Sequence, residues 1–372
     1  MKNILVIGGG KIGSVVAELL VDTPEAGGYR VTVADHCAAT LARLDADPQR
    51  SPRLSTLLLD VTDPVQLSHA LEGRFAVLSA APYHLTLHVA RAAKAAGVHY
   101  LDLTEDVAST RAIRALAADA TSAFIPQCGL APGFISIVAA DLARQFDSLD
   151  SVRMRVGALP AYPSNALNYN LTWSTEGVIN EYCEPCEAIV DGQVRDVPAL
   201  EEREEFSLDG VLYEAFNTSG GLGTLCETLA GKVRTLNYRT IRYPGHAAIM
   251  KALLHDLRLK DRRDVLKDIL EKSLPATMQD VVIVFVTVAG LRDGRLQQDT
   301  YARKIYSHVL AGKMHSAIQI TTASSLCAML DLLAAGGLPQ RGFVRQEKVP
   351  LAAFLANRFG RVYAADALAH AA

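Results

Sequence analysis

Short apolar runs and amphipathic stretches alternate through the first 130 residues. The runs rich in Val, Ile and Leu predict strands, over residues 2–7, 30–34, 54–59, 75–79, 99–103 and 123–126. Apolar side chains at helical spacing follow the first run, and a second helical pattern covers 86–96. Because strand and helix alternate, the predicted fold class is α/β, with a parallel sheet covered by helices on both faces.

A glycine-rich turn, Gly8-Gly9-Gly10-Lys11-Ile12-Gly13, joins the first strand to the first helix. Gly8 permits a tight turn, Gly10 lets the backbone approach a pyrophosphate, and Gly13 lets the helix pack closely on the strand. Free N–H groups at the helix N-terminus favour the phosphates. The arrangement predicts a doubly wound Rossmann sheet that binds a dinucleotide. The expected cofactor residues of this turn are Gly8, Gly10, Lys11, Ile12 and Gly13.

An acidic residue ends the second strand at the distance that this motif requires. Asp35 lies 22 residues after Gly13, where a carboxylate hydrogen-bonds the ribose 2′-hydroxyl. No arginine follows it directly to accommodate a 2′-phosphate, so we expect NAD, with NADP less favoured; protonation of His36 would weaken that preference. Asp60 and Val61, after the third strand, are expected to border the adenine.

The pattern changes after about residue 146. A strand is expected over 152–159, and three β-type runs over 281–289, 300–309 and 313–321 predict an antiparallel meander. This favours a second, α+β domain built on a mainly antiparallel sheet. A helix over 324–335 is expected to return to the first domain. The predicted domains are 1–145 for the dinucleotide, 146–322 for substrate and dimerisation, and 323–372 as the returning segment.

Composition excludes several classes of partner. The 372 residues carry a net charge of −3, so no basic field recruits nucleic acid. No signal peptide is recognisable at residue 1, and the longest apolar run, 281–289, is too short for a membrane helix, so we expect a cytoplasmic protein that does not bind membranes. A homodimer is expected, because 281–288 is apolar on both sides. Cys183 and Cys186 have no second ligand pair, so no metal site is predicted.

Several motifs together resemble the saccharopine dehydrogenase and lysine 6-dehydrogenase family, with carboxynorspermidine dehydrogenases as similar relatives. The matching segments span most of the chain: 79–83 (SAAPY), 100–105 (YLDLTE), 129–133 (GLAPG), 172–174 (TWS), 177–178 (GV), 231–233 (GKV) and 240–246 (TIRYPGH). The resemblance implies that a C–N bond of an amino acid is oxidised by hydride transfer to the nicotinamide. Hydrolysis of the imine then follows.

The resemblance leaves the substrate open. The leading interpretation is a saccharopine dehydrogenase, which yields allysine and glutamate. Lysine 6-dehydrogenase, which yields allysine and ammonia, and a carboxynorspermidine-type enzyme are the alternatives. Ala131 stands where fungal saccharopine reductases carry an acid, which favours the lysine branch. A non-catalytic NAD-sensing protein is the alternative from another class, since fold does not determine function.

Residues after the strand ends are expected to share one rim with the cofactor. Ala80, Ala81 and Pro82 are expected at the cofactor itself. The chemistry needs a group that takes a proton from the substrate amine and activates water. The candidate catalytic residues are Tyr83, Asp106, Cys128 and His246, and Glu105 is a base or ammonium anchor. Each candidate also has a structural alternative. Asp106 and Glu105 could cap a helix, and Tyr83 could simply pack against its neighbours. Cys128 could be a buried thiol, and His246 could have a structural role.

Arg242 is the strongest substrate candidate, because an arginine fork binds a carboxylate bidentately. Its alternative is an interdomain salt bridge. The other expected substrate residues are Trp173, Ser174, Asn180 and Tyr243, with a loop at 219–221 as a further candidate. Saccharopine carries three carboxylates and therefore predicts a second cation in the cleft. Lys232, Arg234 and Arg239 lie near Arg242 in sequence and are candidates for that role.

Overall fold

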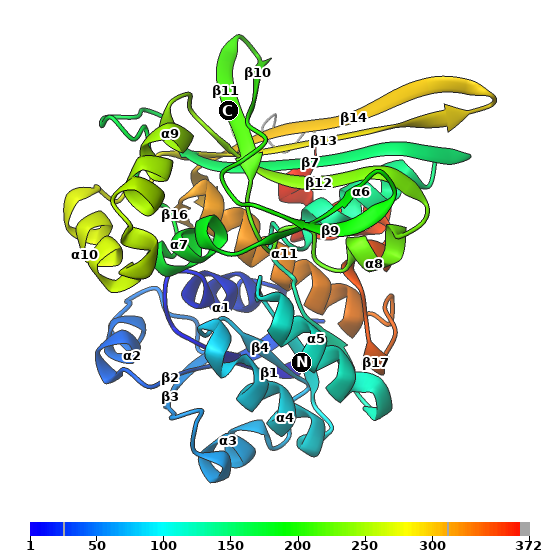
Figure 1. Cartoon of the computed structure of the whole chain (residues 1–372). Coiled ribbons are helices and arrows are strands. Elements are labelled where there is room, and N and C mark those ends of the chain that lie inside the picture. Colours follow the sequence, from blue (N-terminus) through cyan, green and yellow to red (C-terminus); the bar gives the residue numbers. More distant parts are fainter. Residues whose placement is uncertain (25–26, 311, 365–372) are drawn as a thin grey trace. The chain divides into compact units, whose positions relative to one another are not determined.

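The computed structural model describes residues 1–24, 27–310 and 312–364, and it is drawn in Figure 1. The described residues pack into two compact units. Unit 1 consists of the described residues within Met1–Phe134, Leu310–Lys313 and Gln319–Ala372. Unit 2 consists of those within Ile135–Val309 and Met314–Ile318. The chain therefore passes from one unit to the other more than once, and each unit is described by itself.

The sheet of unit 1 has the strand order β17-β6-β5-β4-β1-β2-β3, and its pairings are parallel. Its strands are β1 (Lys2–Ile7), β2 (Tyr29–Asp35), β3 (Leu54–Leu58), β4 (Ala76–Ser79), β5 (His99–Asp102), β6 (Ala123–Ile125) and β17 (Gly342–Phe343). The chain order reverses at β1, which lies between β4 and β2. Dinucleotides bind at such a switch point, outside the carboxyl ends of the strands.

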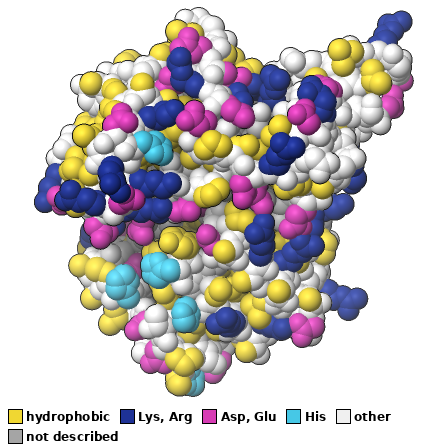
Figure 2. Space-filling model, viewed as in Figure 1, with side chains coloured by type: hydrophobic (Ala, Val, Ile, Leu, Met, Phe, Trp, Pro, Cys, Tyr) yellow, Lys and Arg dark blue, Asp and Glu magenta, His cyan; other side chains and the backbone are white. Residues whose placement is uncertain are grey.

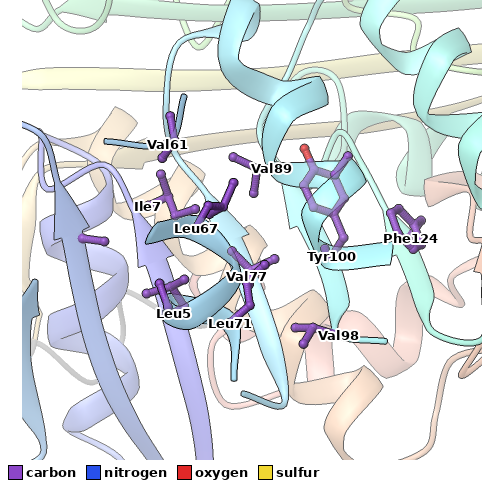
Figure 3. Packing of buried hydrophobic residues seen from close by; sticks show 14 of the residues in the cluster. Leu5, Ile7, Val61, Leu67, Leu71, Val77, Val89, Val98, Tyr100 and Phe124 are labelled. Atoms are coloured by element: carbon purple, nitrogen blue, oxygen red, sulfur yellow. The ribbon is translucent and has the colours of Figure 1, made fainter. Parts of the chain in front are cut away.

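Helices cover this sheet. They are α1 (Gly13–Val21), α2 (Ala38–Asp45), α3 (Pro64–Leu71), α4 (Thr86–Ala96), α5 (Val107–Leu116), α11 (Ala317–Ala334) and α12 (Leu351–Ala356). Side chains of α3, α4 and α5 pack on one face of the sheet; Figure 3 shows Leu67, Leu71 and Val89 meeting Val77 and Tyr100. α3 begins at Pro64, because the Asp63 carboxylate caps the helix by accepting from the N–H groups of Val65 and Gln66 and because proline is suited to the first helical position.

The sheet of unit 2 has the order β10-β11-β12-β7-β13-β14, with β8 pairing β12 and β9. Its strands are β7 (Ser148–Pro160), β8 (Cys186–Val190), β9 (Gln193–Val197), β10 (Glu204–Leu208), β11 (Val211–Asn217), β12 (Val233–Arg242), β13 (Asp280–Arg292) and β14 (Arg295–Tyr306). All its pairings are antiparallel except β12 with β7. The predicted fold class, a Rossmann sheet followed by a mainly antiparallel α+β domain, is confirmed.

Five α-helices are assigned to this part of the chain: α6 (Phe134–Ala143), α7 (Thr175–Cys183), α8 (Leu225–Leu229), α9 (His246–Lys251) and α10 (Arg263–Ser273). Helices α7, α9 and α10 bury one apolar cluster together with Tyr169 and Phe216. A second cluster, which includes Tyr213 and Ile283, lies on the sheet. Unit 2 therefore buries apolar side chains in two separate places.

The expected strand over 313–321 is wrong. Only β16 (Lys313–His315) is extended there; it pairs with β15 (His308–Leu310) in a separate two-stranded sheet. Helix α11 begins at Ala317, because the buried carboxylate of Asp280 accepts hydrogen bonds from the N–H groups of Ala317 and Ile318. A contact with a residue 37 positions away thus overrides the local preference of Ile and Thr for a strand.

Within the described residues one helix, α11, is long and apolar enough to cross a membrane, but 72% of it is buried inside the protein. The core helix of a folded domain can have the same length, apolar composition and burial. On the surface, Figure 2 shows Lys and Arg side chains mixed with Asp and Glu. Exposed cations near α10 have acidic neighbours, as with Arg258 and Asp261, so this surface is not a purely basic patch.

Candidate functional site

The glycine turn of unit 1 has the geometry of a phosphate cradle. A Cβ at Gly13 would lie 1.8 Å from the carbonyl oxygen of Gly8, so α1 can approach β1 only with glycine there. At Gly10, no protein atom lies within 4 Å of the position of a Cβ. Among the described residues, the N–H groups of Gly10, Lys11 and Ile12 donate to no protein acceptor. Open space and unpaired N–H groups at a helix start fit a pyrophosphate.

Asp35 ends β2 beside this turn. Its carboxylate accepts hydrogen bonds from the N–H of Gly9 at 2.7 Å and from the N–H of Cys37 at 2.8 Å. Much of its hydrogen-bonding capacity is therefore used within the protein. Asp60 accepts from the N–H and hydroxyl of Thr62, and the hydroxyl bond is the first cause of its lowered pKa. The adjacent Val61 is largely buried.

The segment after β4 lies at the same edge of the sheet, next to β1. Ala80 and Ala81 are partly exposed, Pro82 is exposed, and Tyr83 is 43% exposed at the start of a short 3₁₀ turn. The Ala80 carbonyl lies 2.8 Å from where a Cβ of Gly8 would be, so this segment touches the glycine turn. Ala80 and Ala81 are therefore adjacent to the cradle, and Pro82 follows them in the chain.

A buried polar network follows β5. The Asp102 carboxylate accepts hydrogen bonds from the Tyr100 hydroxyl at 2.7 Å and from the N–H groups of Thr104 and Gln127 at 3.0 and 2.9 Å. Burial raises the pKa of Asp102 to about 6, and these hydrogen bonds oppose the rise. Cys128 is fully buried, and burial raises the pKa of its thiol. This matches the alternative interpretation of Cys128 as a buried thiol.

The two acids after this strand behave differently. The Asp106 carboxylate caps α5 by accepting from the N–H of Ser109 at 2.6 Å, as the capping alternative describes. Glu105 is partly buried, and burial together with the Asp106 carboxylate raises its pKa to about 7. A carboxyl group with a pKa near neutrality at the carboxyl end of a parallel strand is suited to proton transfer.

In unit 2, Arg242 ends β12 in a fully buried aromatic cluster. Its guanidinium carbon lies 5.1 Å from the ring centre of Tyr169 and 5.9 Å from that of Tyr182. Nε donates to the Tyr182 hydroxyl at 2.9 Å, and Nη1 donates to the Ile241 carbonyl at 2.8 Å. Within the described residues Arg242 forms no ion pair with a carboxylate, so the salt-bridge alternative finds no partner there.

His246, a candidate catalytic residue, belongs to the same buried cluster. Its Nε2 lies 3.0 Å from the Tyr182 hydroxyl, and its Nδ1 lies 2.9 Å from the Leu167 carbonyl. Burial, with the nearby charge of Arg242, lowers the pKa of His246 to about 3. The imidazole is therefore neutral near pH 7 and cannot take up a proton readily. A histidine with so low a pKa is poorly suited to take a proton from a substrate amine near pH 7.

The remaining predicted substrate residues are not all brought to Arg242. Trp173 packs on the cluster that contains Tyr169 and Tyr182. Ser174 caps α7 by accepting from Gly177, and Asn180 accepts a long hydrogen bond from Arg263. Tyr243 lies in the other apolar cluster and donates to the Pro160 carbonyl. Consecutive residues of an extended chain point to opposite faces, which separates Tyr243 from its neighbour Arg242.

The nearby cations considered for a second carboxylate site are engaged elsewhere. Arg234 pairs with Asp150, Arg239 pairs with Glu202 and Glu204, and the ammonium of Lys232 donates to the Thr228 carbonyl. In the candidate substrate loop, Gly221 packs against the ring of Tyr238, where a Cβ would lie 2.3 Å from ring carbon atoms. This close packing gives that glycine a structural role.

The six cysteines are free thiols. Cys183 and Cys186 are both buried, and burial raises the pKa of Cys186 to about 12, so a reactive thiolate is disfavoured. No group of three or more metal-binding side chains is found among the residues that the structure places.

Sequence reasoning missed Tyr169 and Tyr182, which contact Arg242, and it assigned no role to Asp102. Tyr169 and Tyr182 stand in no recognisable motif. Only folding brings Tyr182 of α7, and Tyr169 from the segment before that helix, into contact with Arg242 and His246. Asp102 was visible within the segment 100–105, where an acid inside an apolar strand end is unusual. That feature was the available signal for a buried polar network.

The chain matches two family models. Residues 4–125 match the saccharopine dehydrogenase NADP binding domain, and residues 129–360 match the saccharopine dehydrogenase C-terminal domain. A relative from Pyricularia oryzae, "Saccharopine dehydrogenase [NADP(+), L-glutamate-forming]", is 23% identical over 350 residues, 89% of this chain and 76% of the relative. The Saccharomyces cerevisiae relative of the same name is 28% identical over 275 residues, 70% of this chain and 59% of the relative.

A solved structure has the same fold. Apo saccharopine dehydrogenase (L-Glu forming) from Saccharomyces cerevisiae aligns with a TM-score of 0.76 at 18% identity, covering 98% of this chain and 97% of that one.

These comparisons overturn the preference for NAD. The matched N-terminal model describes an NADP binding domain, and both relatives are named for NADP(+). The inference from Asp35 assigned its carboxylate to the ribose 2′-hydroxyl, whereas in the structure the carboxylate already accepts hydrogen bonds from the N–H groups of Gly9 and Cys37. The family itself agrees with the resemblance seen in the sequence motifs. The two matched models cover most of the sequence, and this chain belongs to the saccharopine dehydrogenase family.

Proposed function

We propose that this chain is an NADP-dependent saccharopine dehydrogenase of the L-glutamate-forming type. Saccharopine, NADP⁺ and water would give allysine, L-glutamate, NADPH and a proton. Family membership and the names of the relatives support the reaction class. The finer assignment, to saccharopine, rests on chemistry in unit 2.

The observation that carries it is the guanidinium of Arg242. The residue is 2% exposed and, within the described residues, forms no ion pair with a carboxylate. The Glu181 carboxylate is near enough to help raise the pKa of Arg242, but within the described residues it forms no ion pair with the guanidinium. A ligand carboxylate in direct contact would supply the negative partner that this buried arginine lacks. Saccharopine offers three carboxylates, and a bidentate guanidinium–carboxylate pair is the strongest contact available for one of them.

Two groups of unit 1 complete the proposal. The unpaired N–H groups of Gly10, Lys11 and Ile12 would hold the cofactor pyrophosphate, and bound NADP⁺ supplies the hydride acceptor. Glu105, with a pKa of about 7, would remove the proton from the secondary amine and later return one to the departing nitrogen. Tyr83 stays a prediction as a residue of the nicotinamide pocket, and His246 is not assigned proton transfer.

The experiment is a substrate comparison on the full chain. Reduction of NADP⁺ is followed by absorbance with saccharopine and with lysine, and allysine and glutamate are identified by mass spectrometry. We expect turnover with saccharopine and none with lysine. Turnover with lysine and release of ammonia would instead assign a lysine 6-dehydrogenase. Binding of NADP⁺ without turnover of either would contradict the proposal and favour a sensing role.

A pair of variants links the activity to the site. Arg242→Ala should lower kcat/KM for saccharopine about a hundredfold, because a charge-assisted fork is lost. Arg195→Ala is the matched control, since it removes an exposed arginine from β9 in the same unit. Equal effects of both variants would contradict the role of Arg242.

A further inference from the structure

A directional chain of hydrogen bonds runs through the buried cluster of unit 2. It links the Leu167 carbonyl, the His246 ring, the Tyr182 hydroxyl and Nε of Arg242, with separations of 2.9, 3.0 and 2.9 Å. His246, Tyr182 and Arg242 are each no more than 2% exposed. Water cannot easily replace any of these bonds, so each partner must be satisfied by the next.

The direction of every proton in this chain follows from its ends. A carbonyl oxygen only accepts, so Nδ1 of His246 carries the hydrogen that it donates to Leu167. The neutral ring then presents an unprotonated Nε2, which accepts from the Tyr182 hydroxyl. The oxygen of Tyr182 in turn accepts from Nε of Arg242, which can only donate. The three side chains therefore fit one protonation pattern.

This pattern determines which edge of the guanidinium remains available. Nε is committed to Tyr182, and one hydrogen of Nη1 is committed to the Ile241 carbonyl. The guanidinium carbon lies over the ring of Tyr169, 5.1 Å from the ring centre. A ligand carboxylate therefore cannot bind to the side-on edge of the guanidinium, which requires the hydrogen on Nε. The end-on fork, through Nη1 and Nη2, keeps hydrogens for a carboxylate.

We propose that Tyr182 and His246 are positioning residues, which hold the guanidinium of Arg242 in a single orientation with its Nη1–Nη2 edge directed at a substrate carboxylate. The identity of that substrate rests on the function proposed above. Tyr182 and His246 act through Arg242 and make no contact with the reacting atoms. Loss of either should weaken substrate binding more than it slows turnover.

The first test reads the histidine directly and needs no substrate. Nitrogen NMR on protein labelled in its histidines distinguishes the two neutral tautomers at pH 7, and the His246 signals are assigned by their loss in His246→Gln. We expect hydrogen on Nδ1 only, and a shift of the Nε2 signal in Tyr182→Phe. Hydrogen on Nε2, or an Nε2 signal unchanged in Tyr182→Phe, would overturn the relay.

The second test measures kinetics with saccharopine and NADP⁺. Tyr182→Phe should raise KM for saccharopine about tenfold, with kcat within about twofold and KM for NADP⁺ unchanged. In an Arg242→Ala background the same change should raise KM less than about twofold, because the residue acts only through the arginine. A full tenfold effect in that background would refute a positioning role.

Two replacements of His246 separate its donor from its acceptor. The side-chain oxygen of Gln can stand in for Nε2 and accept from Tyr182, whereas the amide nitrogen of Asn can stand in only for Nδ1. His246→Gln should therefore keep KM near the wild-type value, and His246→Asn should match Tyr182→Phe. The opposite order would contradict the proposal. Tyr363→Phe, which removes a buried tyrosine hydrogen bond to Thr321 in unit 1, is the control and should leave KM unchanged.

The two tests also separate the relay from the proposed function. Absence of saccharopine turnover, with the expected His246 tautomer and the Tyr182→Phe shift, would refute the substrate assignment and support the relay. Turnover of saccharopine with the other tautomer would support the function and refute the relay.

Discussion

Asp102→Asn should change how the stability of unit 1 depends on pH. The wild-type carboxyl group is 1% exposed and has a pKa of about 6, against 3.8 for an ordinary aspartate. Because the folded state holds its proton to higher pH than the unfolded chain does, the free energy of unfolding falls as pH rises through this range. The Asn side chain has the same shape and does not ionise, so the variant lacks this loss.

The magnitude follows from the two pKa values. A shift of about 2 pKa units corresponds to about 3 kcal/mol, of which about 2 kcal/mol is lost between pH 4.5 and 8. In the Asp102→Asn variant the amide oxygen can still accept from Thr104 and Gln127, and the amide nitrogen can donate to the Tyr100 hydroxyl. Any fixed cost of this rearrangement is the same at every pH. Between pH 4.5 and pH 8, the unfolding free energy of the variant should therefore rise by about 2 kcal/mol relative to that of the wild type.

The assay is urea unfolding at intervals from pH 4.5 to 8, followed by circular dichroism and by fluorescence. Trp173 is the single tryptophan and lies in unit 2, so its fluorescence reports unit 2, while circular dichroism reports both units. Asp264→Asn, at an exposed site of unit 2, controls for the loss of a charge. A difference between Asp102→Asn and wild type that stays constant with pH would refute the reasoning.

Three further changes test other parts of the structure. Gly13→Val should abolish NADP⁺ binding measured by calorimetry, since a Cβ would lie 1.8 Å from the Gly8 carbonyl oxygen; retained affinity would contradict the cradle. Asp280→Ala should lower the free energy of unfolding by about 1–3 kcal/mol in thermal or urea denaturation, because two N–H groups at the start of α11 lose their acceptor; an unchanged melting temperature would argue against the cap. Wild-type kcat/KM for saccharopine oxidation should rise with pH up to about 7, where Glu105 loses its proton. Glu105→Gln should abolish this rise and lower kcat about a hundredfold or more. A rise with pH that survives in the variant would assign the base to another group.

Local patterns were enough to predict the nucleotide-binding fold. Apolar runs alternating with helical spacing specify a parallel sheet, and the positions of Gly8 and Gly13 are set by backbone sterics that hold in any sequence. The cradle therefore lies where the motif places it. The motifs at 129–133 and 240–246 also identified the family, because they are short and specific.

Charge states and partners could not be read in the same way. Asp35 stood where a ribose-binding acid belongs, but the NADP binding family model and the relatives named for NADP(+) overturned the cofactor preference. His246 was a candidate catalytic residue, but burial, together with the charge of Arg242, lowers its pKa to about 3, which does not suit proton transfer near pH 7. Arg234 and Arg239 looked available as carboxylate ligands until their acidic partners were placed.

The sequence by itself determined the order of strands and helices in unit 1, the glycine cradle and the presence of Arg242 in a family motif, because these depend on neighbours within a few residues. The tertiary structure decided that 317–321 is helix and that Glu105 has a pKa near neutrality. It also decided that Tyr182 and His246 fix the orientation of a buried guanidinium. The physical reason is that burial, desolvation and hydrogen-bond direction depend on residues such as Asp280 and Tyr182, which lie tens of positions away in the chain and come into contact only on folding.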